Sequence, residues 1–124
     1  MCIRDRTTPD VGVRRVYDEA KDQDGVRVLV DHKWPRGVRR AKAGLNEWCK
    51  DVSPSTELRK WYKHDPAKFE EFTRRYRVEL EDPERAEALQ HLRELAIGHR
   101  LTLLTATKNP DISQAAVLRD LLRL

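Results

Sequence analysis

The sequence predicts a small α/β domain of three layers, in which a short, mostly parallel sheet is flanked by helices. Two apolar runs, Val26–Asp31 and Arg100–Ala106, have the length and composition of buried strands. Segments with the apolar periodicity of amphipathic helices lie between these runs, and another follows the second run. Helices that connect consecutive strands are typical of parallel sheets, so we expect at least one parallel strand pair.

A further strand is expected near the beginning of the chain, at Val13–Asp18, where apolar and cationic residues alternate. A polar segment that ends at Asp24 and Gly25 separates it from the run that begins at Val26. This connection is too short for a helical crossover, which takes about a dozen residues. We therefore expect either a hairpin-like strand pair or a loose loop here.

Three helix starts between the apolar runs are marked by a capping residue followed by proline. The expected N-caps are Ser53, Asp65 and Asp82. The helix after Asp82 is expected to end at Gly98, because glycine favours the backbone conformation that follows a helix. The helix after Asp65 carries its large apolar residues on one face. These residues are Phe69, Phe72, Tyr76 and Leu80.

Two segments complete the expected fold. Leu45–Val52 fits either a helix or an extended stretch that turns Trp48 inward, and the pattern alone does not decide between them. Ile112–Leu124 has the spacing of an amphipathic helix and closes the chain.

Length and composition indicate one globular, mildly basic domain. The chain has 124 residues, of which 37% are charged and 39% hydrophobic, with a formal net charge of +4. This charge suits an anionic ligand but is weak as a signature of nucleic-acid binding. No apolar run approaches the roughly 20 residues of a membrane helix, and no signal peptide is apparent. We therefore expect a cytoplasmic protein without a membrane partner.

The first six residues, MCIRDR, read as the translation of a transposon end used in sequencing adapters. We therefore expect residues 1–6 to be derived from an adapter rather than from the native protein. The single α/β domain is then expected to occupy residues 13–124.

A binding site is expected where the two apolar runs end, because open α/β sheets bind ligands at the carboxyl ends of their strands. If the two strands are adjacent and parallel, both ends open on the same edge of the sheet. Cationic side chains, backbone N–H groups and a helix N-terminus at this edge favour a phosphate or carboxylate ligand. The expected site residues are Asp31, Trp34, Arg36, Gly37, Thr105, Thr107, Lys108 and Ser113.

Each of these residues has an expected role. Asp31 is the candidate catalytic residue, as a general base or a hydrogen-bond acceptor, while Arg36 and Lys108 clamp the anion. Trp34 forms a pocket wall or stacks on a ring, and Gly37 lets the backbone approach the ligand. The hydroxyl groups of Thr105, Thr107 and Ser113 orient the ligand.

Structural roles compete with these functional ones. Asp31 also fits a turn cap, Trp34 also fits a packing plug between loop and helix, and the cations between Lys33 and Lys42 also fit a solvated face. Cys49 has no histidine at close spacing and fits a buried structural thiol. A triad of Ser113, His64 and Asp31 is conceivable, but no spacing specifies it, so whether the protein is an enzyme stays open.

No cofactor or metal site is indicated. The chain has no glycine-rich dinucleotide or nucleoside-triphosphate loop, and its four histidines do not form a ligand pair. The alternative to a small anionic ligand is a nucleic-acid-associated or regulatory module, whose phosphate contacts would come from the Lys33–Lys42 loop. A third possibility is a protein-interaction domain that uses the charged helix Pro66–Leu80.

Long stretches of the sequence resemble the YeaO-like branch of the domain of unknown function 488 (DUF488) family. These stretches are VRVLVDHKWPRG, DVSPSTELRKWYKHDPAKFEEFTRRYRVEL and LTLLTATKNPDISQAAVLRDLL, and the resemblance runs from Val13 to Leu122. It implies a small bacterial or archaeal α/β protein, and it implies no particular activity.

Two departures from the family pattern bear on function. The family reads V-D-R-x-W-P-R-G at the first strand end, whereas His32 and Lys33 follow the aspartate here. A distant branch carries cysteines at positions that look like Thr105 and Ser113 in this chain. Thiol chemistry imagined for that branch therefore does not carry over.

Overall fold

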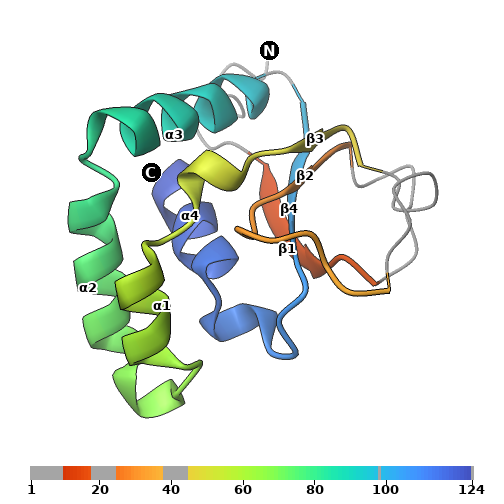
Figure 1. Cartoon of the computed structure of the whole chain (residues 1–124). Coiled ribbons are helices and arrows are strands. Elements are labelled where there is room, and N and C mark those ends of the chain that lie inside the picture. The colour runs from red at the N-terminus through yellow and green to blue at the C-terminus, as the bar shows by residue number, and fades with distance from the viewer. Residues whose placement is uncertain (1–9, 18–24, 38–44, 98, 124) are drawn as a thin grey trace.

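The structure is a computed structural model that describes residues 10–17, 25–37, 45–97 and 99–123 (Figure 1). The segment expected to derive from an adapter, residues 1–6, lies outside the described residues, and so does Gly98, the expected helix end. The second half of the Lys33–Lys42 loop, residues 38–42, also lies outside them.

A four-stranded sheet with only parallel pairings forms the centre of the molecule. Its strands are β1 (Val11–Arg15), β2 (Val26–Leu29), β3 (Glu47–Trp48) and β4 (Leu101–Thr105), in the order β1-β4-β2-β3. The predicted α/β class and parallel sheet are confirmed. The hairpin-like pair is wrong, because β4 lies between β1 and β2 and all three strands run in the same direction.

The central place of β4 follows from its composition. All five of its residues are buried, with Leu103 in the main core and Leu104 in a smaller cluster on the other face of the sheet. A strand that is apolar on both faces is most stable in the interior of a sheet, where neighbouring strands pair with both of its edges. The last strand of the chain therefore inserts between the first two.

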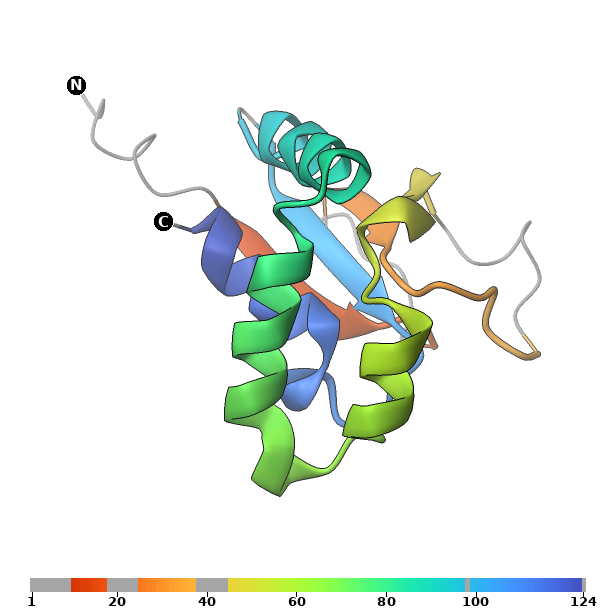
Figure 2. The same cartoon turned by 60° about the vertical axis from the view of Figure 1, so that its left-hand side comes forward.

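In the described residues, four helices pack against one face of the sheet. They are α1 (Thr56–Tyr62), α2 (Phe69–Glu79), α3 (Pro83–Leu95) and α4 (Gln114–Leu122), and short 3₁₀ turns precede α1, α2 and α4. All four contribute to one core cluster on the same face of the sheet (Figure 2). In the part of the chain that the structure describes, helices thus form one layer rather than the two that we expected.

The other face of the sheet carries a smaller apolar cluster. Its buried members are Val16, Leu29 and Leu104, and Trp34 and Trp48 pack against them. Trp48 belongs to β3, so the ambiguous segment before α1 is extended as far as Trp48 and then forms a 3₁₀ turn.

Two of the three expected N-cap residues stand at the N-terminus of a helical segment, and one does not. Asp65 caps the 3₁₀ turn before α2 and accepts a hydrogen bond from the Ala67 backbone N–H at 3.0 Å. Asp82 occupies the N-cap position of α3, where its side chain makes no capping hydrogen bond. For α1 the N-cap is Ser55, whose Oγ accepts from the Leu58 N–H at 3.1 Å. Ser53 is buried instead, and its hydroxyl closes the preceding 3₁₀ turn.

Helix α1 ends in two consecutive non-glycine residues with left-handed backbone conformation, Lys63 at φ 49° and His64 at φ 56°. The Cβ atom of an L-residue makes this conformation unfavourable, and glycine has no Cβ. We expect Lys63→Gly to raise the free energy of unfolding by about 0.5–1 kcal/mol. Urea denaturation measures the change.

Lys60→Gly provides the matched control, because Lys60 is an exposed lysine in the helical part of α1. Glycine in a helix interior costs about 1 kcal/mol, so the two substitutions are expected to have opposite signs. A loss of stability in Lys63→Gly as large as that in Lys60→Gly would contradict the strain argument.

Candidate functional site

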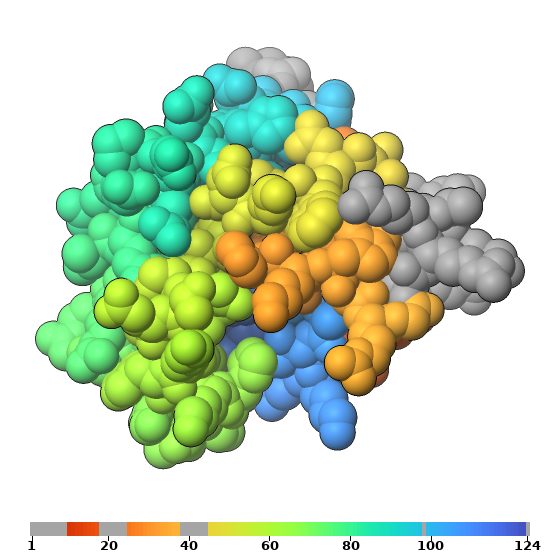
Figure 3. Space-filling view, viewed as in Figure 1, coloured from red at the N-terminus to blue at the C-terminus, as the bar shows by residue number. Residues whose placement is uncertain are grey.

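A pocket of about 420 Å³ lies at the carboxyl ends of β2 and β4. Figure 3 shows it as a hollow between the orange segment that follows β2 and the yellow-green helix α1. Residues 31–35 form one wall, and Arg59, Tyr62 and His64 form the opposite wall, at and just after α1. Thr107 and Gln114 contribute from the end of β4 and the start of α4. The two strand ends therefore open on one edge, as the sequence predicts.

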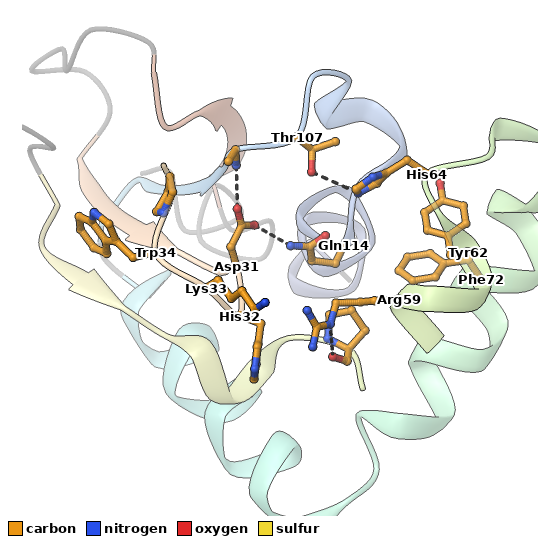
Figure 4. A pocket seen from close by; sticks show the side chains of 13 residues that line it. Asp31, His32, Lys33, Trp34, Arg59, Tyr62, His64, Phe72, Thr107 and Gln114 are labelled. Carbon is orange, nitrogen blue, oxygen red and sulfur yellow. Dashed lines mark hydrogen bonds between the residues drawn. The ribbon is translucent and has the colours of Figure 1, made fainter. Parts of the chain in front are cut away.

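Asp31 connects the three elements that meet in the pocket. Its Oδ1 accepts hydrogen bonds from Thr105 Oγ1 at 2.8 Å and from Gln114 Nε2 at 2.7 Å. Its Oδ2 accepts one from the Ala106 backbone N–H at 2.8 Å (Figure 4). One carboxylate thus ties the end of β2 to the end of β4 and to the first residue of α4.

Burial raises the pKa of Asp31 above its ordinary value. The hydrogen bonds from Ala106, Thr105 and Gln114 oppose this shift, because they stabilise the ionised carboxylate. Both carboxylate oxygens already accept hydrogen bonds from the protein. The arrangement therefore suits an organising role for Asp31 better than the abstraction of a proton from a ligand.

The cations on this pocket are Lys33 and Arg59. The Arg59 guanidinium is held in place by hydrogen bonds to the Pro54 carbonyl oxygen at 3.2 Å and to Thr56 Oγ1 at 2.9 Å. Figure 4 shows both cations on the side of the pocket where His32 lies. Asp31 is the one carboxylate among the described residues that line the pocket.

Three more of the expected site residues lie at the pocket. Trp34 lines it and packs edge-on against Trp48, with ring centroids 5.3 Å apart. Thr107 lines it and places its Oγ1 3.4 Å from His64 Nε2. Thr105 is fully buried beneath it and donates to Asp31.

The other expected residues lie elsewhere. Arg36 and Lys108 are exposed and are not among the residues that line the pocket. Gly37 has a positive φ of 80°, a backbone conformation that favours glycine, and it is not among the residues that line the pocket. Ser113 is fully buried, and its hydroxyl donates to the Pro110 carbonyl oxygen at 2.7 Å.

Several pocket residues are absent from the expected set. Arg59 and Tyr62 come from α1, which precedes β4 by about 40 residues along the chain and has no distinctive motif. Ser113 is an expected site residue, whereas its direct neighbour Gln114 is the residue that lines the pocket. His64 projects from the left-handed end of α1, and its two adjacent positive φ values have no signal in the sequence.

The conceivable catalytic groups are not assembled for nucleophilic chemistry. The Ser113 hydroxyl is engaged by Pro110, while His64 contacts Thr107, so these two and Asp31 do not form a relay. Burial is the main cause that raises the pKa of Cys49 to about 11, and Cys49 does not line this pocket. Among the described residues, no three His, Cys, Asp or Glu side chains are placed to hold a metal ion.

No helix in the described ranges has the length and apolar composition to cross a membrane.

Comparisons with known proteins cover nearly the whole chain. A family model described as "Inactive DUF488-N3 subclade" matches residues 10–124. The chain is 48% identical to the uncharacterized protein Rv3073c of Mycobacterium tuberculosis over 112 residues, which are 90% of this chain and 92% of that protein. It is 40% identical to the uncharacterized protein YeaO of Escherichia coli over 114 residues, which are 92% and 97% of the two chains. No solved structure matches.

Proposed function

We propose a function from the premise that this chain belongs to the DUF488 family, and within it to the subclade described as inactive DUF488-N3. The proposed function is to bind a small phosphate-bearing ligand without transforming it. Membership also agrees with the resemblance to the YeaO-like branch, since E. coli YeaO matches over most of its length. The proposed binding site is the pocket at the ends of β2 and β4.

The observation that carries the proposal is the charge distribution in the pocket. Lys33 and Arg59 line it, and the carboxylate of Asp31 is already satisfied by three protein donors. Neither cation forms an ion pair with Asp31 in the pocket. Two cations and one carboxylate give the pocket an excess of positive charge, which favours an anion. Charge-assisted hydrogen bonds from a guanidinium suit phosphate oxygens.

The side chains around the pocket support binding rather than turnover. The hydroxyl groups of Thr105 and Ser113 are buried and hydrogen-bonded within the protein. The one acid, Asp31, is held by donors on both oxygens. The description of the subclade as inactive agrees with a site that binds a ligand without transforming it.

Two substitutions test the site directly. Inorganic phosphate and simple phosphate esters are added at millimolar concentration, and binding is followed by thermal shift and by chemical-shift titration. Lys33→Gln and Arg59→Gln are each expected to weaken phosphate binding about tenfold, because each removes one charge-assisted contact. Circular dichroism checks that both variants remain folded.

Arg36→Gln and Lys108→Gln are the matched controls. Each removes one exposed positive charge near the same strand ends without altering the lining of the pocket. Their affinity for phosphate is expected to stay within about twofold of the parent protein, since exposed charges outside the site act only through screened long-range fields. Equal losses in all four variants, or no binding by the parent protein, would rule out the proposed site.

A further inference from the structure

His32 stands at the boundary between two hollows. It lines the pocket described above, and it also lines a second hollow of about 260 Å³ on its other side. The second hollow is lined, besides His32, by Lys50, Asp51, Ser53, Glu84 and Arg85. His32 is also the position at which this chain departs from the family pattern, where an arginine is usual.

The imidazole faces the second hollow. Its Nδ1 lies 3.5 Å from Ser53 Oγ, and Figure 4 shows the ring pointing away from Asp31. Ser53 is fixed by its own hydrogen bond to the Lys50 carbonyl oxygen and by one from Arg85 Nε to its carbonyl oxygen at 2.9 Å. Ser53 thus gives the exposed His32 ring one fixed neighbour at the second hollow.

Cations approach His32 from both sides. Burial and the positive charges of four neighbours keep the pKa of His32 below its ordinary value. Two of these neighbours line the first pocket and two line the second hollow. In order of their effect they are Arg59, Lys33, Lys50 and Arg85.

Two acids also line the second hollow, Asp51 and Glu84, and Arg85 lies 3.6 Å from Asp82. The lining of this hollow therefore carries two cations and two acids. Lys50 and Arg85 are the groups there that a phosphate would contact, and the two acids oppose its binding.

We propose that the ligand carries a diphosphate, with one phosphate against Lys33 and Arg59 and the other against Lys50 and Arg85, on the two sides of His32. This inference rests on the proposed function and adds the class of ligand. A single phosphate uses half of the cations, whereas a diphosphate engages both pairs at once.

His32 then links binding to pH. The added negative charge offsets the surrounding cations, so the pKa of His32 rises when the ligand binds and the imidazole takes up a proton. The protonated ring becomes a further donor between the two phosphates. Affinity is therefore expected to increase as the pH falls through the pKa of His32. The other charged groups around the ring are Lys33, Arg59, Lys50, Arg85, Asp51 and Glu84.

The test compares inorganic phosphate with pyrophosphate and with methylenediphosphonate, which resists hydrolysis. We expect both diphosphate compounds to bind at least about tenfold more tightly than phosphate, which is one additional charge-assisted contact or more. Lys50→Gln is expected to weaken binding of pyrophosphate about fivefold, since Lys50 is exposed and its charge is partly screened. Binding of phosphate in this variant is expected to stay unchanged.

Glu84→Gln gives a change of opposite sign. It removes a negative charge from the second hollow, so it is expected to strengthen binding of pyrophosphate and to leave binding of phosphate unaltered. Lys60→Gln is the neutral control, because Lys60 is exposed on α1 and lines neither hollow. Histidine NMR signals report a larger rise in the pKa of His32 with pyrophosphate than with phosphate.

The outcomes separate the two proposals. If phosphate binds but pyrophosphate binds no more tightly, or if Lys50→Gln leaves pyrophosphate binding unchanged, the diphosphate inference is wrong and the proposed anion site stands. If neither phosphate nor pyrophosphate binds, the proposed function itself fails.

Discussion

Phe72→Ala is expected to lower the free energy of unfolding by about 3–5 kcal/mol, the usual cost of removing a buried aromatic ring. Phe72 is 1% exposed and stacks on Tyr62, with ring centroids 4.1 Å apart and an interplanar angle of 14°. On its other side it packs against Tyr76 at 5.6 Å. The substitution therefore leaves a cavity in the middle of an aromatic row that joins α1 to α2.

Two further variants on α2 show whether the loss of stability comes from the cavity that the missing ring leaves. Phe72→Leu keeps most of the volume and is expected to cost about 1–1.5 kcal/mol. Val78→Ala removes an exposed side chain from α2 and is expected to change stability by less than about 0.5 kcal/mol. Urea denaturation of the three proteins provides the comparison. A loss in Phe72→Ala no larger than that in Val78→Ala would mean that the aromatic row does not support the core.

Phe72 shows what the sequence can predict of this fold. Its spacing from Tyr76 and Leu80 predicts the buried face of α2, because helical periodicity is a local property of the chain. The proline after Asp65 and Asp82 marks two helix starts for the same local reason. What α2 packs against depends on contacts with residues far away along the chain, and no local pattern records them.

The order of the strands illustrates the same limit. The shortness of the connection between β1 and β2 favours a hairpin, yet β4 takes the position between them. Its insertion buries a strand that is apolar on both faces, and this gain arises only after the last third of the chain is in place. The composition of β4 carries that information, whereas the length of the earlier connection does not.

Some residues of the candidate site can be predicted from the sequence, and others depend on tertiary contacts. Asp31, Trp34 and Thr107 are found from the sequence, because the ends of parallel strands meet at one edge. Arg36 and Lys108 follow the same strand ends, but exposed side chains beyond a turn can point in many directions. Arg59 replaces them at the pocket because α1 folds back over the strand ends, and that placement is a tertiary effect.

Asp31→Ala is expected to lower the free energy of unfolding at neutral pH by about 2–3 kcal/mol, because it leaves three protein donors without their acceptor. The donors belong to Thr105, Ala106 and Gln114, and Thr105 is fully buried. Asp31→Asn keeps an acceptor for two of these bonds but places an amide N–H₂ group opposite the Ala106 N–H. Its cost is expected to be smaller, about 1–2 kcal/mol, the penalty for one unsatisfied donor. Asp120→Ala, at an exposed aspartate on α4, is the control and is expected to have little effect.

The pH dependence of the same variants tests the electrostatic part of the argument. The pKa of Asp31 is raised in the folded protein, chiefly by burial, so the folded state holds this proton more tightly than the unfolded state does. The resulting stability is fully present below the unfolded value, about 3.9, and is lost as the pH rises through the folded pKa. Asp31→Asn lacks this titration, so its deficit relative to the parent protein is expected to be largest in acid and to shrink as the pH rises through that window. Unfolding curves across the acidic range measure the stability deficit of Asp31→Asn. A deficit that grows with pH would show that the hydrogen bonds from the three donors outweigh burial, so that the ionised carboxylate is the form that the fold stabilises.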